Sequence, residues 1–447
     1  MNAIAVALAT LIPLSASSKA PMTIDEAVSI AESNAFSILI AQSNVERSRQ
    51  VLRQAQALLG PQMTATTTYT RFDKELRVDF GPQSIVTRPI DSTTSQVQVG
   101  LPIDISRTIR QGIEAARNQL RAAEASLLAE QEQVRLDVRT AYYRVLQAEE
   151  QVRVGEEQVR LAKERLANAE AAVRAGAGAR IDVLTFEAFL AQSEAELVAF
   201  RNQSALAKQF LNNILGRPID TDFEAVAVEG LPAFPSSVDQ LVETALTRRP
   251  DLKAVELSRE ALRFVRQGEE RGLRPSLAVG VGYTYNWDPQ GFGSERGTTA
   301  GTLTLSLPVF DNGITRARVK AARQDETQLE VRIQQARLGI SLEVRQAVTN
   351  LENAKARYDF ATRAVAQAEE AYRLSVLRLD AGEGIRVEVT DAQANLTRAR
   401  TSRVAARYDY LIAYAQLQRA IGPDGPAEVA AHSNPVRPTE ADQGGNP

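Results

Sequence analysis

The chain consists of two halves with similar sequence patterns, and this internal duplication constrains its fold more than any other feature of the sequence. Three short motifs return at an offset of 206 residues: Leu101-Pro102 as Leu307-Pro308, Ala175-Gly176 as Ala381-Gly382, and Ile214-Leu215-Gly216 as Ala420-Ile421-Gly422. Three upstream matches share an offset of 214 residues: Asp25 with Asp239, Pro61 with Pro275, and Tyr69 with Tyr283. The first copy therefore holds an insertion between Tyr69 and Leu101, where a loop would accept it. The pattern predicts two structural repeats, at 23–216 and 237–422.

Each copy predicts the order helix, strand, strand, long helix, turn, helix. The first helix is expected over 24–58, beginning with the capping-box pair Thr23 and Glu26, and its counterpart over 238–273. The long helices are expected over 106–175 and 314–379. At 1.5 Å per residue each would be about 100 Å long, far longer than an ordinary globular helix.

Apolar residues recur every seven positions along the long helices. In the first copy the larger residues of this periodicity are Val138, Val145, Val152, Val159, Leu166 and Val173. Mostly small residues alternate with them, which permits close helix packing in a coiled-coil-like seam. Because the two shorter helices of a copy together match the length of the long one, they are expected to stack end to end beside it.

Four stretches predict strands, at about 61–72, 92–102, 275–287 and 298–309. Apolar residues alternate with small or polar ones, as in Leu277, Val279 and Val281 against Ala278 and Gly280. This alternation suits a sheet with lipid on one face and water on the other. A soluble hairpin packed on a helix would show the same pattern.

Composition leaves little material for catalysis. Cysteine is absent, and the one histidine is His432 in a Pro- and Gly-rich tail. We therefore expect no catalytic residues, no metal site, no cofactor and no enzymatic activity. A net charge of −3 also argues against nucleic acid as a partner.

The N-terminal residues 1–16 predict a signal peptide, because an apolar run is followed by small residues. A frayed apolar terminus is the alternative. No segment of about 20 apolar residues is present, so a membrane crossing would need a closed β-barrel. Four strands are too few for one, whereas three chains would supply twelve. The segment 217–236 is expected to be a linker, and 423–447 a disordered tail.

The chain resembles the TolC-like outer membrane efflux protein family from Thr23 to Gly422. The resemblance rests on the duplicated layout, on the run Leu-Pro-Val-Phe-Asp-Asn-Gly at 307–313, and on the glycine-containing runs at 175–184 and 381–389. The first copy departs from the pattern, because no Asn-Gly follows Leu101-Pro102.

This resemblance implies a mainly α-helical homotrimer with a small β part. Its twelve-stranded β-barrel would lie in the outer membrane, and a twelve-helix α-barrel would continue through the periplasm. The implied function is passive exit for the substrates of a tripartite efflux pump or a type I secretion system. The implied partners are outer-membrane lipid, a periplasmic adaptor and an inner-membrane pump. In relatives, the equivalent of 217–236 girdles the middle of the tunnel.

Two sets of candidate site residues flank the predicted helix turns. Gly176, Gly178, Gly382 and Gly384 would reverse the chain at the periplasmic tips. They form a helix–helix turn and, by the resemblance, the adaptor-docking tips. Asp182, Glu388 and Asp391 match the family's acidic constriction residues, although acids in a first helical turn also simply favour the helix dipole. The family's basic lock residue falls on Gly384, so a charge lock would need Arg180 or Arg386.

A structural coiled-coil scaffold or a periplasmic adaptor is the competing hypothesis. Such a protein would not need a pair of ten-residue amphipathic strands before each long helix. The transported substrate is not encoded in any recognisable motif, since selection in such systems belongs to the pump.

Overall fold

The computed structural model describes residues 21–233, 237–289 and 295–423. The expected signal peptide, nearly all of the expected tail and part of the linker lie outside these residues. Helices dominate the described chain, and the strands are few.

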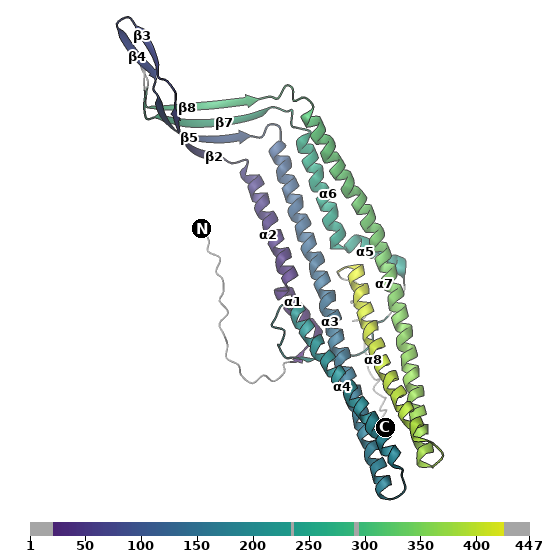
Figure 1. Cartoon of the computed structure of the whole chain (residues 1–447). Helices are drawn as coiled ribbons and strands as arrows, with labels where there is room; N and C mark the ends of the chain where they lie inside the picture. Colours follow the sequence, from purple (N-terminus) through teal and green to yellow (C-terminus); the bar gives the residue numbers. More distant parts are fainter. Residues whose placement is uncertain (1–20, 234–236, 290–294, 424–447) are drawn as a thin grey trace, which may run out of the picture. The chain divides into compact units, whose positions relative to one another are not determined.

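The two copies contribute helices and strands in the same order, except that the first copy has additional short strands (Figure 1). The first copy contains β1 (Pro21–Met22), α1 (Ile24–Asn34), α2 (Phe36–Ala57), β2 (Gln62–Arg71), β3 (Leu76–Phe80), β4 (Gln83–Arg88), β5 (Asp91–Ile103), α3 (Thr108–Arg174) and α4 (Arg180–Ile214). After the linker strand β6 (Glu224–Ala225), the second contains α5 (Val238–Arg248), α6 (Pro250–Glu269), β7 (Ser276–Asn286), β8 (Gly297–Ser306), α7 (Ile314–Asp380) and α8 (Arg386–Ile421).

The compact units of the chain do not follow the two copies. One unit takes the described parts of 1–40, 128–249 and 338–447, and the other takes 41–127 and 250–337. Each unit therefore combines corresponding pieces of both copies. The helices α3 and α7, 67 residues each, run through both units.

Strands from both copies form one antiparallel sheet in the order β2-β5-β7-β8 (Figure 1). The pair β5–β7 joins the two copies, with Leu101 opposite Val279 and Pro102 opposite Ala278. The strands β2 and β8 form the two edges of the sheet. The strand expected to reach residue 309 ends at Ser306, so that prediction ran three residues too far.

The insertion in the first copy forms the hairpin β3–β4, which the sequence did not predict. Its turn contains Gly81 at φ 63°. The insertion had been expected to be a loop, and paired strands instead satisfy its backbone hydrogen bonds.

Each first helix is broken in two, which corrects the expectation of single helices over 24–58 and 238–273. Ala35 ends α1 and Arg249 ends α5, both with extended backbone. At Arg249 the cause is local, because the following Pro250 disfavours helical geometry in the residue before it. Ala35 has no such neighbour, and its break coincides with a tertiary contact.

Both breaks receive the end of another helix of the same copy. Gly216 follows α4 at φ 66° and lies so close to Asn34 that a Cβ atom would collide with its carbonyl group. Gly422 follows α8 at φ 100° and lies against Arg248 and Arg249. The last turns of α4 and α8 thus meet the breaks, which agrees with end-to-end stacking of the short helices.

In the unit formed by 1–40, 128–249 and 338–447, buried tyrosines hold the linker. The Tyr142 hydroxyl lies 2.7 Å from the carbonyl oxygen of Met22 and 2.8 Å from that of Val226. These carbonyls belong to the parallel pair β1–β6 and its continuation. Burial raises the pKa of Tyr142 to about 12, so the hydroxyl keeps its proton at neutral pH. Tyr410 of α8 donates to Pro232 of the linker at 2.7 Å.

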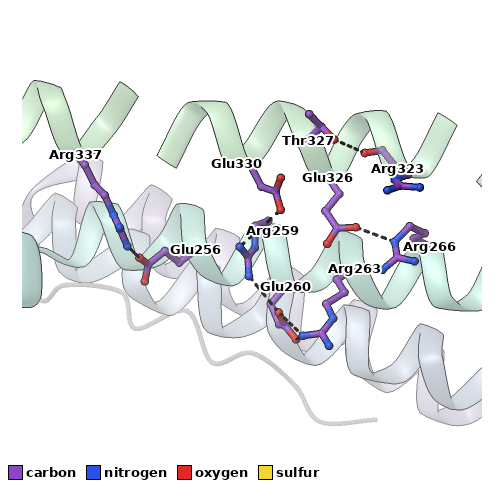
Figure 2. A network of polar contacts seen from close by, with 10 residues as sticks. All are labelled: Glu256, Arg259, Glu260, Arg263, Arg266, Arg323, Glu326, Thr327, Glu330 and Arg337. Carbon is purple, nitrogen blue, oxygen red and sulfur yellow. Dashed lines mark hydrogen bonds and ion pairs between the residues drawn. The ribbon is translucent and has the colours of Figure 1, made fainter. Parts of the chain in front are cut away.

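In the unit formed by 41–127 and 250–337, ion pairs join α6 to α7. Figure 2 shows Arg337 beside Glu256, Arg266 beside Glu326, and Arg259 facing Glu330. The three distances are 3.0, 2.8 and 3.9 Å. A single exposed pair contributes about 0–1 kcal/mol, so this ladder orients the helices more than it stabilises them.

We expect Gly216→Ala to lower the thermal unfolding temperature markedly. The new Cβ would meet backbone atoms of Asn34 and would also occupy a left-handed conformation. Gly176→Ala is the matched control, because Gly176 also has a positive φ of 74° but open space around it. That control carries only the conformational cost of about 1–2 kcal/mol. Equal losses in circular dichroism melts of both variants would contradict the close contact at Gly216.

Candidate functional site

The four-stranded sheet has one apolar face. Leu101, Val279 and Leu303 lie opposite one another across three strands and are 40%, 39% and 71% exposed. Val97, Val99, Val281 and Leu305 share this face and are also exposed. The other face carries small and polar residues such as Thr64, Gln98, Gly280 and Thr302. A sheet exposing so much apolar surface in a single chain is suited to a lipid or protein environment.

Aromatic residues lie at the end of the sheet remote from the helices. The rings of Tyr285 and Trp287 pack edge to face with centroids 5.0 Å apart. The Trp287 indole donates to the Ser95 hydroxyl at 2.9 Å, and the Tyr69 hydroxyl donates to Asp91 at 2.6 Å. Tyr69 and Trp287 thus each combine an exposed apolar body with a bonded polar tip, the arrangement typical of side chains at a membrane–water interface.

At its opposite end the sheet passes into α3 and α7 through two carboxylate-capped corners. Asp311 accepts from the backbone amides of Gly313 at 3.0 Å and Thr315 at 2.7 Å. A hydrogen bond from the Thr315 side chain, together with these two amides, lowers the pKa of Asp311. Asp104 accepts from Ile109 and Arg110 in the first copy. Both corners use an acid to satisfy amides at a helix start.

The two glycine turns are built alike. Gly176 and Gly382 have φ of 74° and 79°. Gly176 donates to Val173, and Ala177 donates to Ala172, which is the Schellman pattern that ends a helix at a left-handed residue. Gly178 and Gly384 are needed for a different reason, since a Cβ there would lie 3.1 Å from Val173 N and 3.0 Å from Leu379 N.

The acidic candidates near these turns differ in their partners. Asp182 accepts from the Ala179 amide at 3.0 Å and lies 2.9 Å from Arg386 of the other copy. Glu388 lies 3.4 Å from Arg378 of α7. Asp391 is exposed and makes no ion pair with any described residue.

The structure therefore brings Asp182 and Arg386 together and leaves Arg180 apart. Within the described part of the chain, the Arg180 side chain makes no hydrogen bond or ion pair. The sequence could not choose between the two arginines, because both stand beside a glycine turn. The approach of α4 to α8 at the tips decides the choice.

Sequence reasoning missed two other contacts within the unit formed by 1–40, 128–249 and 338–447. Arg165 of α3 lies 3.5 Å from the Tyr372 hydroxyl of α7, which joins the two copies above the tips. Tyr142 holds the linker, as described above. Tyr372 occupies a position of the seven-residue apolar periodicity, and Tyr142 directly follows another such position, Ala141. A hydroxyl at these places was the available signal.

No helix in the described ranges has an apolar stretch long enough to cross a bilayer. Among the same residues, no group of three or more His, Cys, Asp or Glu side chains could hold a metal ion.

Comparison with known proteins identifies the family. A model of the outer membrane efflux protein family matches residues 27–217 and 241–423. The chain is similar to the pyoverdine export outer membrane protein OpmQ of Pseudomonas putida, with 24% identity over 413 residues that cover 89% of this chain and 85% of that protein. It is also 24% identical to the outer membrane protein TolC of Vibrio cholerae over 320 residues, 69% of this chain and 72% of that one.

Solved structures share the fold. CusC superposes with a TM-score of 0.76 at 17% identity, covering 89% of this chain and 92% of the other. The CmeC outer membrane channel of Campylobacter jejuni superposes with a TM-score of 0.74 at 17% identity, covering 89% and 85%.

These similarities agree with an outer-membrane channel, and they do not support the scaffold or adaptor hypothesis. The matched family consists of channel proteins and not of enzymes. The chain belongs to the outer membrane efflux protein family, and it is an efflux channel of the outer membrane.

Proposed function

We propose that three copies of the chain close their sheets into a twelve-stranded β-barrel in the outer membrane. The observation that carries this proposal is a sheet with two open edges and one continuous apolar face. Unpaired backbone groups in lipid cost several kcal/mol each, so a membrane-spanning sheet must pair both edges. Four strands are too few to close a barrel alone, and a third copy completes the twelve.

The helices support the same assembly as a twelve-helix periplasmic α-barrel. Several large apolar residues of α4 and α7 remain exposed in one chain: Val198, Leu206, Phe210, Val331, Leu338, Leu342 and Phe360. Leu338 is 75% exposed, which is costly for a residue that has no partner in water. Neighbouring copies would cover these side chains.

The barrel would provide passive exit for the substrates of a tripartite efflux pump or a type I secretion system. The tips carry exposed Ile181, Leu184, Ile385 and Val387 around the glycine turns. Such apolar patches beside the helix–helix turns suit docking of a periplasmic adaptor, through which an inner-membrane pump would be engaged. The linker at 217–236 would lie in the equatorial region of the tunnel.

Detergent extraction tests the trimer. The protein should sediment with outer membranes, require detergent for release, and run as a trimer in native mass spectrometry. A water-soluble monomer recovered without detergent would overturn the barrel proposal.

At the tips, the pair Asp182–Arg386 is suited to act as a charge lock. Within one chain it joins α4 of the first repeat to α8 of the second repeat, and the Asp182 side chain is only 13% exposed. Partial burial strengthens the attraction within such an ion pair relative to one in water. Opening the tips would separate these two helices and break the pair.

We expect Arg386→Ala to raise single-channel conductance in planar bilayers by releasing α8 from α4. Arg180→Ala is the matched control and should leave conductance near that of the wild type, because Arg180 makes no such pair. The exchange Asp182→Arg with Arg386→Asp should restore the low conductance. Equal effects of the two arginine variants would remove the lock hypothesis.

The acids Asp182, Glu388 and Asp391 would form rings of carboxylates in a trimer. Such rings favour cations and bind divalent ions. Two of the three are balanced by arginines, Asp182 by Arg386 and Glu388 by Arg378. The unpaired Asp391 would therefore dominate the field of the constriction.

Glu388→Ala combined with Asp391→Ala should weaken cation preference and divalent-ion block in planar bilayers. Of the single variants, Asp391→Asn should have the larger effect and Glu388→Gln the smaller, because Glu388 is already paired. Unchanged selectivity in the double variant would rule out the ring.

A further inference from the structure

We propose that Phe310 of each subunit enters a pocket at the helix end of the sheet in the neighbouring copy of the chain. This contact would fix the register between the subunits. This inference rests on the proposed homotrimer and adds the contact that would align its subunits. Three observations carry it: an open pocket at one edge, an uncovered aromatic ring beyond the other edge, and the internal duplication.

The pocket lies where β2 and β5 meet the helices. It has a volume of about 530 Å³, and its lining includes Leu58, Gln62, Thr64, Pro102 and Ile109. Gln62 and Thr64 belong to the edge strand β2, so the pocket is reached from the side where a neighbouring copy would pair. The lining is mainly apolar, with two amides and a hydroxyl, which suits an aromatic ring.

Beyond the opposite edge strand, Phe310 is 83% exposed and Val309 is 88% exposed. Both follow β8, which ends at Ser306. Continuing the alternation of β8, Phe310 falls with Thr304 and Ser306 on the small and polar face. Val309 falls with Leu303 and Leu305 on the apolar face. Thr64, Gln98 and Gly100 of the pocket share the face of Phe310.

The duplication within one chain predicts how β8 pairs with β2 of the neighbouring copy of the chain. Within one chain, β5 of the first repeat pairs with β7 of the second, and Pro102 lies opposite Ala278. The second-repeat equivalent of Pro102 is Pro308, at the offset of 206. The first-repeat equivalent of Ala278 is Thr64, at the offset of 214. Pro308 should therefore lie opposite Thr64 of the neighbouring copy.

This register places every relevant side chain consistently. Phe310 lies opposite Gln62 of the neighbouring copy, at the mouth of the pocket. On the apolar face, Val309 lies opposite Met63 and Leu303 opposite Tyr69 of that copy. Met63 and Tyr69 are 70% and 60% exposed in one chain, so the register covers apolar surface that a single chain leaves exposed.

Cysteine cross-linking tests the register, and the chain has no native cysteine to interfere. Ser306→Cys with Thr66→Cys places two thiols directly opposite each other, within the Cα separation of about 4.4–6.8 Å that a disulfide accepts. The matched controls Ser306→Cys with Thr64→Cys and Ser306→Cys with Thr68→Cys shift the partner by two residues, to about 7–8 Å. Under mild oxidation, only the first pair should give covalent dimers and trimers in denaturing gels.

Alanine substitution tests the pocket. Phe310→Ala should lower the temperature at which the detergent-solubilised trimer dissociates, because the ring leaves an unfilled apolar pocket. Phe310→Leu should recover part of the loss. Val309→Ala, the adjacent control on the apolar face, should have a smaller effect.

The outcomes separate this inference from the proposed assembly. A wild-type protein that is monomeric in detergent overturns the homotrimer itself. A trimer that cross-links best through Thr64→Cys or Thr68→Cys overturns the register while the trimer stands. Cross-linking through Thr66→Cys with equal losses for Phe310→Ala and Val309→Ala overturns the pocket contact alone.

Discussion

The open edges of the four-stranded sheet are the constraint on which the rest of this structure depends. The strands β2 and β8 each present one side whose backbone groups are not paired in the sheet. In water such edges invite association, and in lipid they are prohibitively costly. The apolar face makes the constraint stronger, because Leu303 and Leu305 belong on an edge strand that a single chain leaves uncovered. These open edges are the ground on which we propose that several copies of the chain assemble.

The duplication shows where the two copies of the sequence had to stay alike. Gly216 and Gly422 end equivalent helices against equivalent breaks, and Gly176 and Gly382 turn the chain with nearly the same φ. These positions are fixed by backbone geometry, which no change of side chain can replace. The copies differ where contacts are made by side chains. Asp182 pairs with Arg386 across the copies, whereas Glu388 pairs with Arg378 inside its own.

Much of the fold was accessible from periodicity because long amphipathic elements repeat one signal many times. The seven-residue periodicity predicted α3 and α7 to within a few residues. The period-2 alternation predicted β5, β7 and β8, whereas it was ambiguous in β2, which is mostly Thr. The predictions that were wrong concern the helix break at Ala35 and the hairpin β3–β4. The break at Ala35 has no local cause and coincides with the packing of Gly216 on Asn34. The hairpin β3–β4 lay in an insertion too short to show a clear alternation.

The sequence by itself determined the duplication, the long helices, the amphipathic strands and the glycine turns, because each follows from local periodicity or backbone geometry. Only the tertiary structure decided which residues from distant parts of the chain meet. It paired β5 with β7, selected Arg386 over Arg180 as the partner of Asp182, and placed the Tyr142 hydroxyl against the carbonyl groups of Met22 and Val226. Such contacts join residues 84 to more than 200 positions apart. Their specificity lies in the packing of whole helices and strands, which no local pattern records.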